Sequence, residues 1–389
     1  MILTLLYYSF LFAIFYAFIL GLLIYVPYPF QSIAIYLHFI NFPFFVNWDK
    51  DGERFGFRAG SVKNIKITTR DGITLGGWHI LPRNTVTKPK PNMNHVDKNV
   101  PLSSAELVFL YFHGNAGNRA TFHRTDFYKM MTSLVKTSHV VAIDYRGFGD
   151  STFALPTEEG LKIDALAAYD WIVAQGVDPS RIIIVGHSLG SGVATDLAHT
   201  ISVNKAKIGS PGCGGLVILS GYASIADASL GYPMVPVLKP FCGYPEYEKW
   251  VKSKMTDKWH SAKKMPFVSC PVLIIHGFKD FEIRPWQARA LFLQAAQGRL
   301  EKPLLKEDEG FWELRQPRPF DAKEVAGISV THLDGDEGTL WSLDHSMTPN
   351  SSTKTPNHVW FLEVKHAGHN TLSTHQVVKD TIDSWVEGI

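Results

Sequence analysis

Residues 181–200, RIIIVGHSLGSGVATDLAHT, decide the fold of this chain. The β-branched run 182–185 is typical of a buried strand. In residues 190–200, small and apolar side chains recur at the spacing of a helix. Between them lies Gly186-His187-Ser188-Leu189-Gly190. A G-x-S-x-G sequence at such a junction is typical of a sharp turn that lifts the serine hydroxyl above the sheet. The pattern therefore predicts Ser188 as a nucleophile.

The same alternation of strand and helix extends along the chain on both sides of this unit. Short apolar runs occupy residues 106–112, 139–144, 181–186, 215–220, 271–276 and 358–364. Amphipathic stretches occupy residues 121–136, 157–175, 190–204, 285–299 and 373–386. Continuously apolar strands with helices between them predict a mostly parallel sheet that is covered on both faces. Residues 62–69 and 73–81 flank the hairpin turn signal Asp71-Gly72, and this pair brings the expected sheet to eight strands.

Three segments do not follow the alternation within an α/β domain that we expect to cover residues 62–389. Residues 82–104 are rich in proline and asparagine, which predicts a surface loop. Residues 223–269 combine aromatic residues with prolines between two strands, and we interpret them as a small lid over the site. Residues 300–357 are polar, acidic and low in periodicity, which predicts a surface insertion.

The N-terminus has the composition of a membrane anchor. No charged side chain precedes Asp49, and residues 1–27 form an apolar run long enough to cross a bilayer as one helix. The run lacks the basic start and the cleavage site of a signal peptide, so we expect it to be retained. Residues 28–61 then form a juxtamembrane segment, either at the interface or packed under the catalytic domain.

The side of the membrane is left open by the residues themselves. Basic residues follow the apolar run, which by charge count alone would place the domain in the cytosol. Asn350-Ser351-Ser352 is a glycosylation sequon, which would matter only for a domain in the lumen.

The overall composition excludes several classes of protein. Hydrophobic residues make up 46% of the chain and charged residues 19%, which excludes general disorder. A net charge of +2 gives no basic field for nucleic acid. The three cysteines have no metal-ligand spacing and form at most one disulfide. We expect no metal and no organic cofactor.

A serine nucleophile needs a base, and the base needs an acid that orients it. Asp280 is the first carboxylate after the strand at 271–276, and Glu282 is its rival two residues later. His369 and His366 both follow the strand at 358–364. Because His369 stands next to the last helix, we expect His369 to be the base and Asp280 its acid, which gives the chain order Ser188, Asp280, His369.

Stabilisation of a tetrahedral oxyanion requires backbone N–H groups that point at it. Leu189, the residue after the nucleophile, is one expected donor. Asn115 is the second, because the glycine-bearing loop His113-Gly114-Asn115 directly follows a central strand. Arg146, after the strand at 139–144, is interpreted as a structural anchor for loops.

These motifs together resemble the α/β-hydrolase superfamily. Between about residues 105 and 295 the chain is most similar to the membrane-anchored lysophosphatidylserine lipase and monoacylglycerol lipase group, through HGNAGNR, DYRGFGDS, GHSLGSGVAT and CPVLIIHGFKD. The resemblance implies an integral protein of the endoplasmic reticulum, single-pass, with a lumen-facing site and a lipid substrate. The segments 223–269 and 300–357 depart from the group, and these segments would set the fit of the substrate.

The main interpretation is a serine hydrolase that cleaves carboxylic esters of lysophospholipids or monoacylglycerols through an acyl-enzyme. A protein depalmitoylase is an alternative, although residues 1–212 contain no cysteine that could be acylated. A serine peptidase is another. A non-catalytic binding protein that kept the fold is the least favoured, because candidates for nucleophile, acid, base and oxyanion loop occur in the right order.

Overall fold

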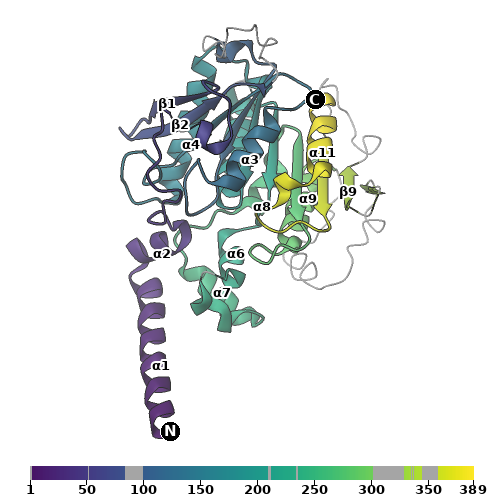
Figure 1. The fold of residues 1–389 in the computed structure, drawn as a ribbon. Helices are drawn as coiled ribbons and strands as arrows, with labels where there is room; N and C mark the ends of the chain where they lie inside the picture. The colour runs from purple at the N-terminus through teal and green to yellow at the C-terminus, as the bar shows by residue number, and fades with distance from the viewer. Residues whose placement is uncertain are drawn as a thin grey trace.

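The computed structural model describes residues 2–50, 52–83, 100–208, 212–233, 235–300, 328–333, 335, 337–343 and 358–389. Most of the loop expected at 82–104 and the sequon at Asn350 lie outside these residues, as does most of the expected insertion 300–357. The described residues form a twisted sheet between two layers of helices, with one long helix that projects away from them (Figure 1).

The sheet contains ten strands in the described part of the chain. Their spatial order is β1-β2-β4-β3-β5-β6-β7-β10-β9-β8. The bounds are β1 Val62–Thr68, β2 Thr74–Ile80, β3 Leu107–Phe112, β4 Ser138–Ile143, β5 Ile182–His187, β6 Gly215–Leu219, β7 Val272–Gly277, β8 Ile328–His332, β9 Gly338–Leu343 and β10 Val359–Val364. The six strands from β4 to β10 in this order are parallel, and β1, β2, β9 and β8 add antiparallel pairs at the two edges.

The expected count of eight strands is wrong, because β8 and β9 come from the segment interpreted as an insertion. They form a hairpin that extends the sheet beyond β10, with Trp360 opposite Ser342 and Val364 opposite Gly338. β9 contributes the buried Trp341 and Leu343 to the core, whereas Ile328 and Val330 of β8 are only partly buried against it. An edge strand that is half-buried on one face and exposed on the other, as β8 is, lacks the continuous apolar run by which the central strands were recognised.

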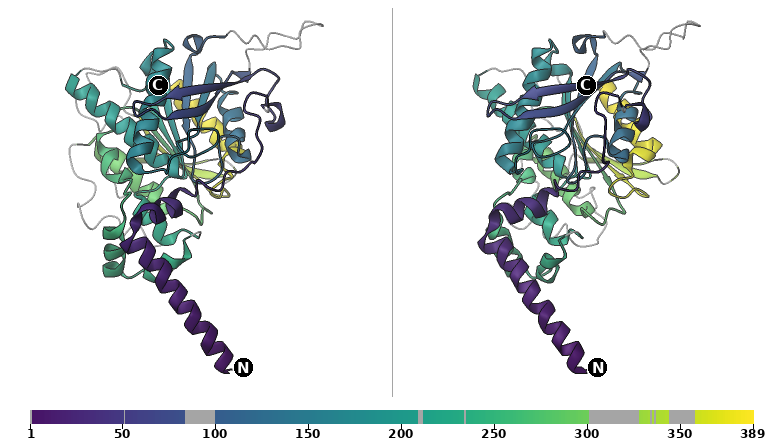
Figure 2. Two further views of the ribbon diagram at one scale, coloured as in Figure 1. Left: turned by 90° about the vertical axis from the view of Figure 1, so that its left-hand side faces the viewer. Right: turned by 60° about the vertical axis from the view of Figure 1, so that its left-hand side comes forward.

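Helices cover the two faces of the sheet as the alternation predicts. On one face, α4 Glu158–Ala174, α5 Leu189–Ile208 and α9 Pro285–Gln297 share a core with alternate strand residues. On the other face, α3 Phe122–Met131 and α11 Gln376–Glu387 pack on the intervening residues. The views in Figure 2 show the sheet between these two layers. The short helices are η1 Glu53–Phe55, η3 Leu102–Ser104, η4 Pro179–Arg181, η6 Met265–Phe267 and η10 Leu372–Thr374.

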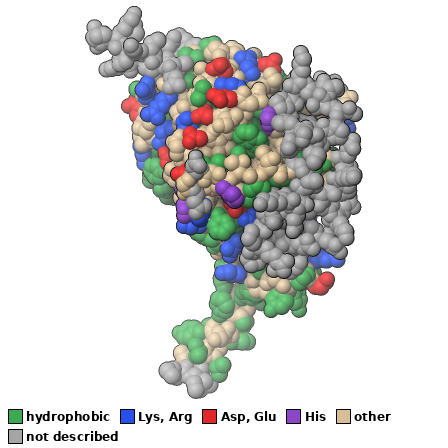
Figure 3. Space-filling model, turned by 90° about the vertical axis from the view of Figure 1, so that its right-hand side faces the viewer, with side chains coloured by type: hydrophobic (Ala, Val, Ile, Leu, Met, Phe, Trp, Pro, Cys, Tyr) green, Lys and Arg blue, Asp and Glu red, His purple; other side chains and the backbone are tan. Residues whose placement is uncertain are grey.

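The N-terminal segment forms helix α1, Ile2–Tyr25, followed by α2, Pro27–Tyr36. Residues 4–25 of α1 are long and apolar enough to cross a membrane, and none of the most apolar stretch is buried in the protein. Figure 3 shows hydrophobic side chains on the described part of α1, well clear of the globular part. α2 instead packs on the globular part of the chain, where Ile35 and Tyr36 join the core.

The segment expected to form a lid contains α6 Ile225–Gly231, η5 Pro236–Phe241, α7 Pro245–Lys254 and α8 Ser261–Lys264. Its first part lies beside the C-terminal half of α1 in Figures 1 and 2. There the Tyr16 hydroxyl donates a 2.9 Å hydrogen bond to the carbonyl of Val237, and Leu20 packs against the lid residues Leu230, Leu238 and Val251. The lid and the apolar helix are therefore in direct contact.

The last helix offers a test of the packing. Trp385 of α11 is 1% exposed, and a Cβ on Gly215 would lie only 2.5 Å from its ring. Trp385→Ala should lower the free energy of unfolding by about 3–5 kcal/mol, because it leaves a large cavity. Glu387→Ala on the exposed end of the same helix should change it by less than about 0.5 kcal/mol. Urea unfolding in detergent measures both, and equal midpoints would contradict this packing.

Candidate active site

Ser188 lies at a strained turn between β5 and α5. Its φ of +53° falls in the left-handed region that non-glycine residues rarely adopt. The turn needs glycine on both sides. A Cβ on Gly186 would lie 2.2 Å from the carbonyl oxygen of Gly190, and one on Gly190 would lie 2.1 Å from the carbonyl oxygen of Phe112. The Ser188 N–H donates to the carbonyl of Leu219 at 3.0 Å, which fixes the turn to β6.

The structure brings Ser188, His369 and Asp280 together at the carboxyl ends of β5, β7 and β10. The distance from Ser188 Oγ to His369 Nε2 is 2.9 Å, and from His369 Nδ1 to Asp280 Oδ2 it is 2.7 Å. A carboxylate only accepts hydrogen bonds, so Nδ1 carries the proton and Nε2 is free to accept from the serine hydroxyl. All three side chains are buried.

The geometry also separates the rival residues. Glu282 approaches the other ring nitrogen of His369, at 3.9 Å, whereas both Asp280 oxygens are engaged. Asp280 Oδ1 accepts from the N–H groups of Glu282 and Ile283, each at 2.9 Å. His366 is exposed on the turn after β10. The site geometry thus pairs Asp280, and not Glu282, with His369 Nδ1.

Two further side chains hold His369 in place by binding its backbone carbonyl. The carbonyl of His369 accepts from His187 Nε2 at 3.1 Å and from Ser220 Oγ at 3.0 Å. His187 is the first of the two variable residues of the G-x-S-x-G motif, and no pattern in the sequence singles out either His187 or Ser220. Both side chains bind a main-chain carbonyl. Because every residue has such a carbonyl, the contact has no recognisable signature in the sequence.

The charges around the imidazole shift its pKa. Burial disfavours the charged ring, but the hydrogen bond and the negative charge of Asp280 outweigh burial, with a smaller contribution from Glu282. The pKa of His369 is therefore raised above its ordinary value. Burial raises the pKa of Asp280, and the contacts with His369 and His276 more than offset this, so its pKa is lowered. Asp280 stays charged while His369 titrates.

Arg124 holds the carbonyl groups of the loop after β3. Its buried guanidinium donates to the carbonyl oxygens of Gly114 at 3.2 Å, Asn115 at 3.1 Å, Ala116 at 2.8 Å and Asn118 at 2.8 Å. One rigid cation therefore orients three consecutive peptide groups.

The juxtamembrane residues 35–43, which we call the strap, hold the opposite side of the same loop. The N–H groups of Ala116, Gly117 and Asn118 donate to strap carbonyls, those of Tyr36 at 2.9 Å, Ile40 at 2.5 Å and Phe42 at 3.1 Å. The Asn118 side chain adds bonds to Asn41 and Pro43. The sequence allows this segment to lie either at the membrane interface or packed under the domain. In the structure it packs on the domain, and Leu37 and Ile40 line a cavity at Ser188.

Together these contacts set the direction of the Asn115 N–H. In a trans peptide the C=O of one residue and the N–H of the next point in opposite directions. Because Arg124 and His113 Nδ1 fix the carbonyl of Gly114, the N–H of Asn115 points away from them. A Cβ on Gly114 would lie 3.1 Å from the Ser188 Cβ, so the loop adjoins the serine. Leu189 begins α5, where N–H groups have no partner within the helix.

Arg146 has the structural position expected for it. Its guanidinium binds Asp164 of α4 at 2.7 and 3.0 Å and Asp71 of the β1–β2 turn at 2.8 and 3.2 Å. A second buried cation, Arg119 in the loop after β3, binds Asp144 and Asp150. Both arginines join loops to the framework and do not line either cavity at Ser188.

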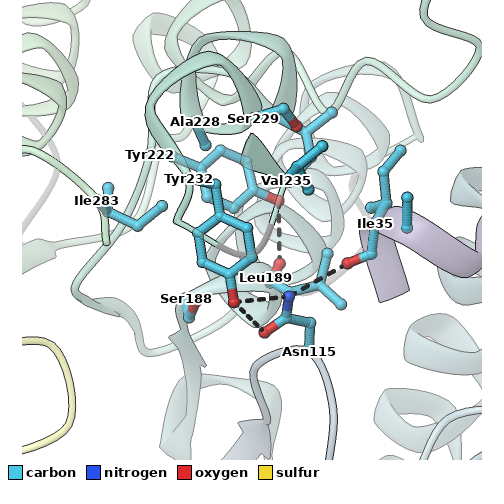
Figure 4. Close-up of a pocket in the computed structure, with 12 residues that line it drawn as sticks. Ile35, Asn115, Ser188, Leu189, Tyr222, Ala228, Ser229, Tyr232, Val235 and Ile283 are labelled. Atoms are coloured by element: carbon cyan, nitrogen blue, oxygen red, sulfur yellow. Dashed lines mark hydrogen bonds between the residues drawn. The ribbon is translucent and has the colours of Figure 1, made fainter. Parts of the chain in front are cut away.

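Two cavities meet at Ser188. The larger one, about 360 Å³, is lined by His123, His187, His369, Glu282, Leu37 and Ile40, and we call it the His123 cavity. The smaller one, about 30 Å³, lies between α2 and α6 and is lined by Ala34, Ile35, Leu189, Ala228, Val235 and Ile283. We call it the α6 slot. Figure 4 shows Tyr232 of the lid and Asn115 side by side at its mouth, next to Ser188.

Comparisons with known proteins found a matching family model, related sequences and similar solved structures. A model described as the alpha/beta hydrolase family matches residues 107–380. Lysophosphatidylserine lipase ABHD12 of Macaca fascicularis is 31% identical over 292 residues, which are 72% of this chain and 69% of the relative. The Mus musculus protein of the same name is 32% identical over 273 residues, 69% of this chain and 64% of the relative. The Pyrococcus furiosus esterase Pf2001 aligns with a TM-score of 0.49 at 15% identity, covering 88% of this chain and 95% of that one.

The raised pKa of His369 predicts the pH dependence of hydrolysis. The imidazole accepts a proton only when neutral, so kcat/KM should fall as the pH drops through its pKa, with a midpoint above about 6.5. Asp280→Asn should move this midpoint down and cost about 10⁴-fold in kcat. Glu282→Gln should cost far less. A larger loss in Glu282→Gln than in Asp280→Asn would reverse our assignment of the acid.

The contacts of Arg124 predict a second effect. Lysine keeps the charge but cannot bind four carbonyls at once, so Arg124→Lys should misplace the Asn115 N–H. We expect kcat to fall by about 10²-fold with little change in KM, together with weaker binding of a trifluoromethyl ketone that mimics the tetrahedral intermediate. A variant that melts at the wild-type temperature and keeps its kcat would show that Arg124 has no part in positioning the loop.

Proposed function

The chain belongs to the alpha/beta hydrolase family, and on that basis we propose that it is a serine hydrolase that cleaves carboxylic esters of single-chain lipids. The observation that carries this proposal is the hydrogen-bonded series Ser188, His369, Asp280 at the end of the sheet. Lysophospholipids and monoacylglycerols are the substrates we favour. The relatives named lysophosphatidylserine lipase support a lipid substrate.

In the proposed reaction Ser188 Oγ attacks the ester carbonyl while His369 Nε2 takes the hydroxyl proton. The N–H groups of Asn115 and Leu189 stabilise the oxyanion, and Asp280 stabilises the imidazolium. The intermediate collapses as His369 returns its proton to the leaving alcohol, and an acyl-enzyme remains. Water then attacks with His369 again as base, which releases the fatty acid and restores Ser188.

The apolar helix α1 supports a site at a membrane. We propose that residues 1–27 anchor the protein as a single span, with residues 28–61 as the juxtamembrane segment and residues 62–389 as the catalytic domain. Tyr16 lies within this span, so its contact with Val237 places the lid against the membrane-spanning helix, beside the bilayer in which single-chain lipids are concentrated. By its resemblance to the lipase group, we place the protein in the endoplasmic reticulum.

Purified full-length protein tests the reaction and its substrate. Ser188→Ala should lower release of fatty acid from lysophospholipids and monoacylglycerols by at least about 10⁴-fold. Ser191→Ala is the matched control. The buried Ser191 hydroxyl makes no hydrogen bond within the described residues, so its loss should change the rate by less than about threefold.

Other outcomes identify other functions. Serine-dependent turnover of a palmitoyl thioester or a peptide, with none of the lipids, would replace the lipid proposal by a depalmitoylase or a peptidase. If no ester, thioester or peptide is turned over in a Ser188-dependent way, the result would favour a non-catalytic binding protein.

A further inference from the structure

The two cavities at Ser188 differ in whether His369 lines them. His369 lines the His123 cavity, together with Glu282, His123 and Asn370, but it does not line the α6 slot. In ester hydrolysis the base must also protonate the leaving alcohol, so the alcohol part of the substrate has to lie within reach of His369 Nε2. The alcohol therefore belongs in the His123 cavity, and the acyl part extends from Ser188 the other way.

The α6 slot has the chemistry that an acyl chain requires. Aliphatic side chains from α2, α6 and the loop after α6 line it, and Leu189 and Ser188 lie at its base. The polar ring of Tyr222 also borders the slot, but its hydroxyl is engaged, since it donates to the carbonyl of Leu189 at 3.0 Å. The slot leads from the nucleophile toward the lid, and Val235 on its wall lies two residues before Val237, which contacts α1.

The slot is nearly closed in this structure. Its volume of about 30 Å³ is less than a tenth of the volume of the His123 cavity, about 360 Å³, so it has no room for a long acyl chain as it stands. Tyr232, at the end of α6, closes it from the side of the His123 cavity and lines both spaces. The Tyr232 hydroxyl and the Asn115 side chain are hydrogen-bonded at 3.2 and 3.3 Å, and Asn115 Nδ2 also donates to the Ile35 carbonyl of the strap at 3.3 Å (Figure 4).

We propose that the α6 slot is the acyl-chain site and that Tyr232 is its gate, which opens when the Tyr232–Asn115 contact breaks and α6 moves away from α2. The contact joins the lid directly to the loop that supplies the oxyanion donor. Tyr232 is half-buried and its hydrogen bonds are long, so breaking them costs little. This inference rests on the proposed ester hydrolysis and assigns the two halves of the substrate within it.

The test compares two esters with one leaving group, 4-nitrophenyl dodecanoate and 4-nitrophenyl acetate, on full-length protein in detergent. The measured quantity is the ratio of their kcat/KM values. Ala34→Leu on α2 and Val235→Phe in the loop after α6, at two half-buried positions that line the slot, should each lower the ratio by about tenfold or more. Tyr232→Phe keeps the ring but removes the hydroxyl, and should raise the ratio by about two- to tenfold.

Two controls keep the result interpretable. Ala174→Leu adds the same atoms at an exposed position on α4, outside both cavities, and should leave the ratio unchanged. Labelling of Ser188 by a fluorophosphonate with a short alkyl group shows that each slot variant still folds around a reactive serine.

Wild-type ratios in labelled Ala34→Leu and Val235→Phe would overturn the assignment of the slot. An unchanged or lower ratio in Tyr232→Phe would overturn the gate. Failure of the wild-type protein to hydrolyse either ester through Ser188 would instead overturn the proposed function itself, so the two failures are distinguishable.

Discussion

The site depends on the orientation of one peptide group, the one that joins Gly114 to Asn115. Arg124 binds the carbonyl side of the loop, and the strap at residues 35–43 binds its N–H side. A loop that follows a strand has no ladder of its own to hold it, so without these partners its N–H groups would turn toward water or toward one another. Because the strap begins in the last turn of α2, which follows α1, the segment that leads out of the apolar helix is built into the proposed catalytic centre.

The sheet performs the rest of the positioning. Ser188, Asp280 and His369 each follow a parallel strand, and parallel strands end at one edge, so residues almost two hundred positions apart meet within hydrogen-bond distance. The positive φ of Ser188 is tolerated because Gly186 and Gly190 allow β5 and α5 to approach closely. The lid covers this end of the sheet. Its Tyr232 contacts the Asn115 side chain, and its Val237 contacts α1.

The features that could be predicted from the sequence are those with a local signature. The strand and glycine pattern around Ser188 indicates the turn, and the first carboxylate after β7 and a histidine after β10 indicate its partners. The strap has no such signature, because its contacts with the loop are made mainly by backbone carbonyls, which every residue has. Arg124 and Ser220 also act on carbonyls. The hairpin β8–β9 was missed because its two strands are buried on one face only, so neither has the continuous apolar run of a central strand.

The most direct test of this account is an experimental structure of the protein after reaction with a fluorophosphonate, whose phosphoryl oxygen occupies the position of the oxyanion. The account predicts a phosphonate on Ser188 Oγ, with that oxygen about 2.7–3.1 Å from the backbone nitrogens of both Asn115 and Leu189, and the strap bonded to the loop. An oxygen that points away from Asn115, or a strap that is detached from the loop in a protein that still reacts, would contradict it.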